Sequence, residues 1–445
     1  MTPATTTDQR KDAHHPVQVA LDGDFALDDL RALPSTGRAT RICAAQATQA
    51  ALWRLDATGH AEPPAPLDSP TPPTTPTVAD TALLRHLETS GLFQPPVSEQ
   101  VAALTPRLAA SWLALAAHWA DLADVSGDLR FLNTACKLTG AVWLRHIHAD
   151  GAWHSTELTG QLGAVGRLLA SATSELRQRL DTRLLLAEPA AGPHDLALAP
   201  LRPSSRTSRA RIIVLAASGS RSAGRLVAAA TVAALPIDAV CWYTSRTAAP
   251  PPASNYSAAW YPPGPPTPDT AVDLPASVPA TTAGSWDGVA AAIRAAHADL
   301  VLLVGMPVVP ASVLDAARLG TLNAHNGALP SHRGMDAVGW ALINNQPVVC
   351  SLHLARAAVD TGELLAARPV PASPTRTLAA RVKSTQLRLL LAGATYVATT
   401  GSLPDSTPQP AGGTQYYRLH PHLKRLLDAS PYANDDHPQW MASLP

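Results

Sequence analysis

Three side chains in the C-terminal half of the sequence have the types and spacing that an acyl transfer requires. Asn323 and His325 are two residues apart in LNAHN, so both side chains leave one face of an extended strand. Asp360 follows downstream in the turn AVDTGE. Attack of an amine on an acyl carbon builds negative charge on oxygen, which needs donors placed beforehand. The departing amine proton needs an acceptor, so this carboxamide, imidazole and carboxylate predict a catalytic centre.

The elements around these residues are expected to form an α/β sheet. From Arg211 onward, apolar strand-like runs alternate with helical patterns, which favours a doubly wound, mostly parallel, Rossmann-like sheet. In such sheets the site lies at the carboxyl ends of strands, where Asn323 and His325 fall. The expected strands are 211–217, 237–243, 299–305, 320–326 and 348–354. The expected helices are one ending near Leu235 and those at 286–297, 311–319 and 375–391, and the proline-dense stretch 250–282 is expected to be a loop with little regular structure.

Further residues accompany this trio in a fixed order. They are Asn323-Ala324-His325, Leu329-Pro330, Arg333-Gly334, Trp340, His353 and Asp360-Thr361-Gly362. In order and spacing this set resembles the formyltransferase family, which includes phosphoribosylglycinamide, methionyl-tRNA and amino-sugar N-formyltransferases. The resemblance extends from about Arg211 to about His420, including the segment PQPAGGTQYYR. It implies a folate-dependent enzyme with 10-formyltetrahydrofolate as the donor cosubstrate.

The resemblance also implies roles for individual residues. Asn323 would hydrogen-bond the formyl oxygen, His325 would donate to the oxyanion, and Asp360 would orient the histidine and move the amine proton. No metal ion is implied. Taken one at a time, an Asn or Asp in a turn and a buried His also have ordinary structural explanations. The residues that would bind the folate are Leu329, Pro330, Arg333, Gly334, His353, Thr361 and Gly362, with His353 in a supporting position.

Two local features bear on the identity of the acceptor, one a departure from the family and one a resemblance to it. After His325 the family often has Pro-Ser-Leu-Leu-Pro, whereas this chain has Asn-Gly-Ala-Leu-Pro, a variant that indicates specialised metabolism. Ser218, Gly219 and Ser220 resemble the glycine-rich loop that cradles the substrate phosphate in the purine enzyme. A plain strand-to-helix turn is the other interpretation of these three residues, and the sequence leaves both open.

Two linkers divide the rest of the chain. In the region before the second linker, Trp112, Leu115, Trp119 and Leu122 recur at spacings of three and four, which predicts one face of an amphipathic helix. We expect this helical part to select the acceptor or to mediate a homodimer. The predicted units are a disordered N-terminus at 1–16, a small unit at 17–62, a Pro/Thr linker at 63–78, a helical accessory domain at 79–197, a linker at 198–210, the catalytic domain at 211–420 and a C-terminal tail at 421–445.

Composition excludes several function classes. The 34 basic and 34 acidic residues balance, and only a short segment follows His420, so a tRNA or other nucleic-acid substrate is not expected. The four cysteines are scattered singly, and His146 and His148 point to different helix faces, so no metal site is predicted. A polar N-terminus and the lack of a long apolar run predict a cytoplasmic protein that does not contact a membrane.

The sequence therefore predicts an N-formyltransferase that acts on a primary amine of a small molecule or a biosynthetic peptide. Two alternatives stay open. With water in place of the amine, the same residues would hydrolyse 10-formyltetrahydrofolate. The second alternative is a binding module that has the folate-binding fold and no catalytic activity. The complete set of Asn323, His325 and Asp360 speaks against it, because a scaffold does not need all three.

Overall fold

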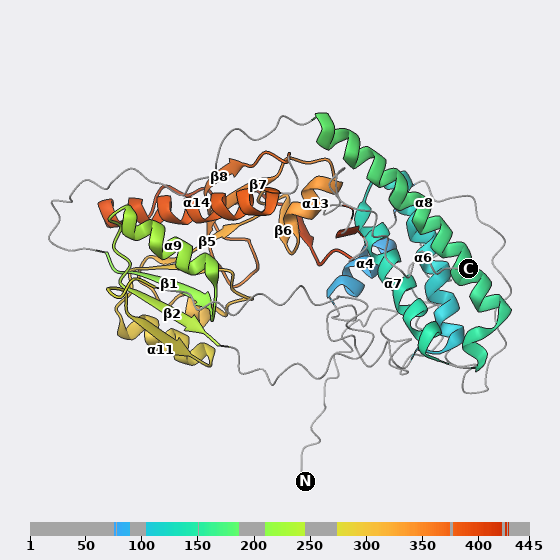
Figure 1. The fold of residues 1–445 in the computed structure, drawn as a ribbon, viewed down its shortest axis with the longest axis horizontal. Coiled ribbons are helices and arrows are strands. Elements are labelled where there is room, and N and C mark those ends of the chain that lie inside the picture. The colour runs from blue at the N-terminus through green and yellow to red at the C-terminus, as the bar shows by residue number, and fades with distance from the viewer. Residues whose placement is uncertain are drawn as a thin grey trace, which may run out of the picture.

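The computed structural model describes two regions of the chain, a helical one and an α/β one. The described residues are 75–76, 78–89, 104–149, 151–186, 210–244, 274–373, 377–420, 423–424 and 426. The expectations for 1–16 and 17–62 lie outside them, as do nearly all of the two predicted linkers and most of the C-terminal tail. We call residues 78–186 the helical region and residues 210–426 the α/β region (Figure 1).

The α/β region is built on a seven-stranded sheet with the order β3-β2-β1-β4-β5-β7-β8. Strands β3, β2, β1, β4 and β5 run parallel to one another. Strand β7 is antiparallel to both β5 and β8. The predicted mostly parallel sheet is thus confirmed. Its strands are β1 (Ile212–Ala217), β2 (Ala239–Tyr243), β3 (Ala280–Ala283), β4 (Leu300–Val304), β5 (Gly320–His325), β7 (Val349–Leu354) and β8 (Leu364–Pro369).

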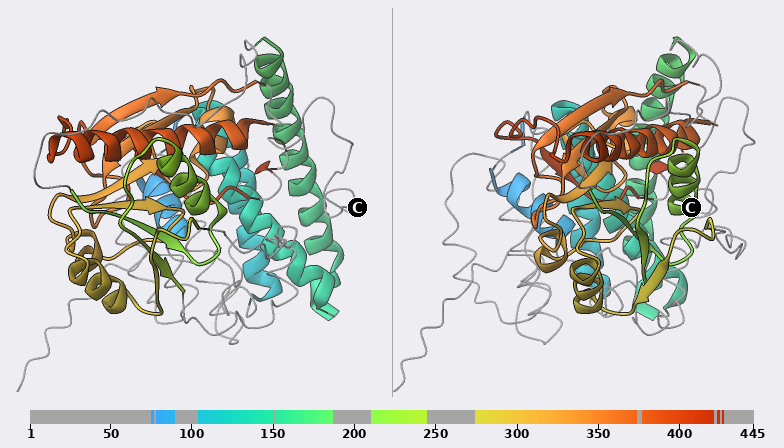
Figure 2. Two further views of the ribbon diagram at one scale, coloured as in Figure 1. Left: turned by 60° about the vertical axis from the view of Figure 1, so that its left-hand side comes forward. Right: turned by 90° about the vertical axis from the view of Figure 1, so that its left-hand side faces the viewer.

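Helices cover both faces of the sheet, because alternate residues of each strand point to opposite sides. Ile212 and Val214 of β1 pack beneath α9 (Arg221–Val232) and α14 (Leu378–Thr400). Ile213 and Leu215 pack against α11 (Trp286–Ala295) and the short α12 (Ala311–Leu314). Figures 1 and 2 show this layering, with α9 and α14 on one side of the strands and α11 on the other.

Two expectations for this region were wrong. Strand β3 occupies the end of the stretch 250–282 that was expected to lack regular structure, because Ala280–Ala283 pairs in parallel with the exposed edge of β2. The helix expected at 375–391 is α14, which continues to Thr400 because buried Ala394 and Val397 extend its apolar face. It ends only at Gly401, whose φ of 71° is left-handed and suits glycine.

A second, two-stranded sheet lies between the two regions. Strands β6 (His332–Gly334) and β9 (Thr414–Tyr416) pair in parallel, and α13 (Ala337–Ile343) follows β6 directly. Figure 1 shows β6 and α13 between the large sheet and the helices. The sequence did not predict these three short elements.

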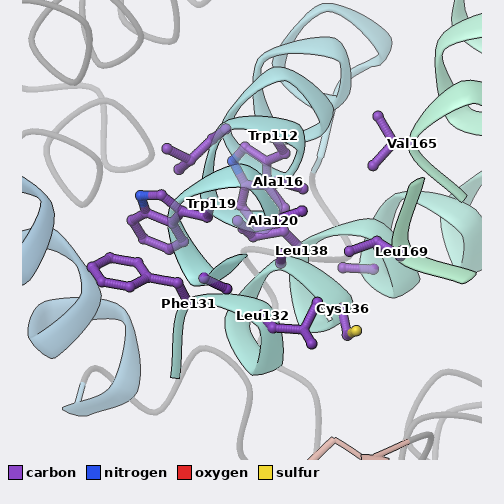
Figure 3. Packing of buried hydrophobic residues seen from close by; sticks show 14 of the residues in the cluster. Trp112, Ala116, Trp119, Ala120, Phe131, Leu132, Cys136, Leu138, Val165 and Leu169 are labelled. Carbon is purple, nitrogen blue, oxygen red and sulfur yellow. The ribbon is translucent and has the colours of Figure 1, made fainter. Parts of the chain in front are cut away.

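The helical region consists of α4 (Val78–Thr89), α6 (Pro106–Ser126), α7 (Leu129–His148), the 3₁₀ turn η1 (Gly151–His154) and α8 (Thr156–Leu186). Thr105 caps the start of α6, and Gly127, with φ of 70°, ends it. The predicted apolar face is confirmed: Trp112, Leu115, Trp119 and Leu122 are all buried in the core that Figure 3 shows in part.

The two regions share that hydrophobic core. Trp340 of α13, Tyr416 of β9 and Leu419 belong to the same buried cluster as the side chains of α6 and α7. The buried amide of Asn133, on α7, accepts a hydrogen bond from the backbone N–H of His420 at 2.6 Å. It also donates one to the carbonyl of Arg418 at 3.4 Å. The helical region therefore supports the segment that carries β9, while the predicted domain boundaries themselves stay predictions.

Histidines of the helical region have ordinary protein partners. His118 contacts the buried carboxylate of Asp80 at 3.4 Å, and His146 donates to the carbonyl of Trp153 at 2.7 Å. Across the described ranges, no group of three or more His, Cys, Asp or Glu side chains is placed to hold a metal ion. Within those same ranges, no helix combines the length and the apolar character needed to cross a membrane.

Candidate active site

Asn323 and His353 face each other across two neighbouring strands. Asn323 of β5 lies directly opposite His353 of β7 in the antiparallel register, and His325 lies opposite Ser351. Directly opposed residues on one face of such a pair bring their side chains within contact distance. The structure thus brings the predicted Asn323 and His325 to one face, at the carboxyl end of β5.

His325 is buried and lies between two hydrogen-bond acceptors. Its Nε2 is 2.8 Å from the carbonyl oxygen of His332, so Nε2 carries a hydrogen and donates it. Its Nδ1 is 3.3 Å from Oδ2 of Asp360. Burial lowers the pKa of His325, and this effect outweighs the opposing influence of the Asp360 carboxylate and of the His332 carbonyl. Nδ1 is therefore the atom through which a proton can pass between the imidazole and the carboxylate.

Asp360 contacts both histidines and a backbone amide. Its Oδ1 lies 3.4 Å from Nε2 of His353, and its Oδ2 accepts a hydrogen bond from the N–H of Gly334 at 2.9 Å. Burial alone would raise the pKa of Asp360. The contacts with His353, His325 and the Gly334 N–H outweigh it, so the pKa lies below its usual value and the group is a carboxylate at neutral pH.

The orientation of the Asn323 amide bears on its predicted role. His353 donates from Nδ1 to the carbonyl of Leu354 at 2.8 Å, so Nε2 donates to Asp360 only when the ring carries a second proton, and in a neutral ring Nε2 is an acceptor. Asn323 Nδ2 faces that nitrogen at 3.1 Å and Oδ1 of Asp360 at 3.5 Å. The Asn323 oxygen is then the atom left for a ligand. The predicted bond from Asn323 to a formyl oxygen requires the amide to turn over and His353 to carry a second proton.

Gly327 has a steric reason for lying beside His325. A Cβ atom at position 327 would collide with the His332 carbonyl oxygen and would lie only 2.6 Å from Nε2 of His325. The His-Asn-Gly variant therefore lets the chain fold tightly over the His325 imidazole. Ser351 supports this turn, because its hydroxyl donates to the carbonyl of Gly327 at 2.8 Å and accepts from the N–H of Leu329 at 3.3 Å.

The remaining predicted folate-binding residues divide into two groups. Gly334 and His353 line the cavity at the site, whereas Leu329, Pro330, Arg333, Thr361 and Gly362 are not among the residues that line it. These five support the loops instead. Arg333 donates twice to the side chain of Gln409, Thr361 donates to the Ala358 carbonyl, and a side chain at position 362 would strike the Leu354 carbonyl.

The cavity has a volume of about 580 Å³ and opens beside the carboxyl end of β5. One wall is the loop after β4, from Gly305 to Val309, and a second is β9 with Tyr416 and Tyr417. The third is the face of α14 that carries Gln386. Exposed apolar side chains gather at the rim, namely Val308, Met335 and Val359. A mainly apolar hollow with a few converging polar groups is the usual form of a small-molecule site.

Ser218, Gly219 and Ser220 form the turn between β1 and α9. The hydroxyl of Ser220 accepts from the N–H of Ala223 and caps α9, and Gly219 has a left-handed φ of 77°. None of the three lines the cavity. This geometry accounts for the residues as a strand-to-helix turn, and anion binding at this place stays a prediction.

Sequence reasoning missed several residues that shape the site. Gln409 donates to the backbone carbonyls of Asp360 and Gly362 at 2.9 and 2.6 Å, and so holds the loop that carries the carboxylate. Gln386 donates to the carbonyl of Ala324 at 2.5 Å. The family-like segment 408–418 contained Gln409, but only the folded structure shows its partners.

The fold and site together define a doubly wound α/β protein whose polar cluster lies at the carboxyl ends of the strands, next to a cavity. Residues 262–391 match the family model described as formyl transferase. This part of the α/β region is therefore similar to the formyltransferase family.

Formyltransferases from other organisms match parts of this chain. The phosphoribosylglycinamide formyltransferase of Mycobacterium tuberculosis is 37% identical over 123 residues, which are 26% of this chain and 57% of that protein. The methionyl-tRNA formyltransferase of Parabacteroides distasonis is 31% identical over 143 residues, which are 31% of this chain and 43% of that protein. The chain thus spans roughly half the length of the relatives that it matches.

Solved structures also resemble the chain. A sugar N-formyltransferase from a Shewanella species has 16% sequence identity, covers 51% of this chain and 90% of its own, and has a TM-score of 0.34. A glycinamide ribonucleotide transformylase from Symbiobacterium toebii has 21% sequence identity, covers 44% of this chain and 88% of its own, and has a TM-score of 0.32.

Proposed function

We propose that the protein is an N-formyltransferase that moves a formyl group from 10-formyltetrahydrofolate to a primary amine of a small molecule or biosynthetic peptide. The observation that carries the proposal is the contact of Asp360 with both His325 and His353, beside Asn323 and an apolar-rimmed cavity. A buried carboxylate against imidazoles, with a carboxamide adjacent, supplies a proton acceptor and hydrogen-bond groups at one point.

In the proposed reaction, the amine nitrogen bonds to the formyl carbon and the bond from that carbon to the folate N10 breaks. Nε2 of His325 already donates to the His332 carbonyl, so His325 stabilises the negative charge on the formyl oxygen through Nδ1, once Nδ1 has taken a proton from Asp360. Asp360 takes the amine proton, and the Nδ1 contact at 3.3 Å passes it to His325. His325 returns the proton to the departing folate nitrogen, so no net proton is lost.

In the proposed mechanism, backbone groups hold the reacting side chains in position. The N–H of Gly334 holds Asp360, the carbonyl of His332 holds His325, and the carbonyl of Leu354 fixes the tautomer of His353. Backbone partners on paired strands move little during a reaction, which is what preorganised catalysis needs. The proposal also includes a cytoplasmic location and a homodimer, both of which are expected from the sequence.

The test is a measurement of tetrahydrofolate release from 10-formyltetrahydrofolate, with and without a panel of primary amines. Release that depends on an amine supports transfer, and release in water alone would instead identify a hydrolase. A protein that binds the folate but releases none in any mixture would be a binding module. His325→Ala and Asp360→Asn are the variants that should abolish amine-dependent release, while Lys424→Met, in the α/β region but outside the cavity lining, should not.

A further inference from the structure

Strand β6 supplies a backbone partner to each of the two groups between which the proposed mechanism moves a proton. The carbonyl of His332, the first residue of β6, accepts a hydrogen bond from Nε2 of His325 at 2.8 Å. The N–H of Gly334, the last residue of β6, donates to Oδ2 of Asp360 at 2.9 Å. One short strand thus fixes the imidazole and the carboxylate relative to each other. A shift of β6 would therefore disturb both groups at once.

Strand β6 is held in turn by β9. Within the described residues, β6 pairs with no other strand. In the parallel register Gly334 lies opposite Tyr416, and the carbonyl of Tyr416 accepts from the N–H of Met335 at 3.0 Å. The two strands approach each other so closely here that a Cβ atom at position 334 would collide with the Tyr416 carbonyl oxygen. The position of β6 therefore depends on the position of β9.

The helical region holds the residues that directly follow β9. Asn133 of α7 donates to the carbonyl of Arg418 at 3.4 Å and accepts from the N–H of His420 at 2.6 Å. The Asn133 side chain is completely buried, and Tyr416 and Leu419 pack in the same hydrophobic core. A buried amide whose hydrogen bonds are satisfied in this way makes its surroundings rigid. Asn133 thus connects the helical region to the end of β9.

The α/β region holds the same segment through the residues in between. Trp340 donates from Nε1 to the carbonyl of Tyr417 at 2.8 Å, and Asp336 accepts from the N–H of Leu419 at 3.0 Å. From residue 417 to residue 420, the backbone groups therefore take partners from the α/β region and from Asn133 in turn. Two of these four hydrogen bonds come from the helical region. The α/β region thus supplies only half of the hydrogen bonds that fix the segment behind β9.

We propose that Asn133 is a positioning residue for formyl transfer, which acts on His325 and Asp360 through residues 418–420, β9 and β6. This inference rests on the proposed function and gives the helical region a part in it. The distance from Nδ1 of His325 to Oδ2 of Asp360 is 3.3 Å. A charge-assisted hydrogen bond spans about 2.7–2.9 Å, so any further separation interrupts the transfer of a proton between them. Small movements of β6 should therefore affect the rate of reaction strongly.

The first experiment observes the Gly334 amide directly and needs no turnover. Arg333-Gly334 is the only Arg-Gly pair in the sequence. A full chain labelled with carbon-13 at the arginine carbonyls and nitrogen-15 at the glycines therefore gives one doubly labelled peptide bond, and its NMR signal belongs to Gly334. An amide proton donated to a carboxylate resonates downfield, and Asp360→Asn gives the reference position without that charge. We expect Asn133→Ala to move the Gly334 signal upfield, toward this reference.

The control for the NMR experiment is Leu162→Ala. Leu162 is buried in the same core, so this substitution also destabilises the helical region, but it removes no hydrogen bond. We expect the Gly334 signal of Leu162→Ala to stay at its original position. An unchanged Gly334 signal in Asn133→Ala, or an equal shift in Leu162→Ala, would overturn the proposal. If Asn133→Ala does not fold, Asn133→Asp takes its place, since it keeps the acceptor for the His420 N–H, and it should give a smaller shift in the same direction.

The second experiment measures amine-dependent tetrahydrofolate release. Asn133→Ala should lower kcat roughly tenfold and leave KM nearly unchanged, because the reacting groups are displaced while the cavity lining keeps its residues. Leu162→Ala should keep the kcat of the unaltered chain, and Asn133→Asp should keep more of it than Asn133→Ala. An unchanged kcat, or a rise in KM alone, would contradict a positioning role. Absence of release from the unaltered chain would instead contradict the proposed function, and the Gly334 signal would then decide the connection between Asn133 and β6.

Discussion

Gly327→Ala is the substitution whose consequence follows most directly from the geometry of the site. The added methyl group would meet the His332 carbonyl oxygen and Nε2 of His325, the two atoms of one hydrogen bond, and would lie 2.9 Å from Cβ of Ala337. Moving the His325 ring alone does not relieve the clash with this backbone carbonyl, so the backbone at residue 327 or 332 must shift, and the hydrogen bond that holds His325 is disturbed. Overpacking of this kind costs about 1–3 kcal/mol, and the lost hydrogen bond adds about 1 kcal/mol.

The effect on activity should exceed the effect on stability. A displacement of a catalytic group by about 1 Å lowers the rate on the order of 100-fold. Amine-dependent tetrahydrofolate release measures the rate, and urea unfolding measures the stability. Gly160→Ala on α8 is the matched control, because no atom lies within 4 Å of the new methyl group, and it should gain up to about 1 kcal/mol with full activity. A Gly327→Ala protein with the stability and kcat/KM of the unaltered chain would refute the reasoning.

Three further predictions concern the carboxylate, the pH dependence and the junction of the two regions. Asp360→Asn removes the charge that faces both histidines, so kcat/KM for formyl transfer should fall roughly 10²- to 10⁴-fold; a smaller loss would argue against proton transfer by Asp360. Burial lowers the pKa of His325 and of His332 below the usual histidine value, so the unfolded chain binds protons more readily there. In an NMR titration each ring should therefore take up its proton below about pH 6.5, and a midpoint at or above that value would contradict the burial. Asn133→Ala removes the two hydrogen bonds that join this amide to the His420 N–H and the Arg418 carbonyl in the shared core, and should cost roughly 1–3 kcal/mol in urea unfolding; a loss below about 0.5 kcal/mol would show that this contact does not join the regions.

The large sheet was predictable because its strands are distinctive in sequence. The runs around β1 and β4 are apolar on both faces, as buried parallel strands are. The antiparallel direction of β7 was not predictable, since an apolar run has the same pattern in either direction. Strands β6 and β9 contain three residues each and pair across a long stretch of chain, so no local periodicity indicates them.

The grouping of Asn323, His325 and Asp360 in the candidate site was predictable, whereas the rest of its lining and its geometry were less so. The two-residue spacing of Asn323 and His325 requires a shared face once β5 forms. The approach of Asp360 depends instead on the N–H of Gly334 and on Gln409, which come from distant segments. Lys383 lies on α14 without any accompanying motif, so only the folded chain shows that it reaches the same cavity.

The central claim is that Asn323, His325 and Asp360 transfer a formyl group from 10-formyltetrahydrofolate to an amine. The most direct test incubates the full chain with formyl-labelled 10-formyltetrahydrofolate and a set of primary amines, and follows the label by mass spectrometry. The account predicts label on an amine together with an equal amount of tetrahydrofolate, and neither product with His325→Ala. Label recovered only as formate, or full transfer by His325→Ala, would contradict it.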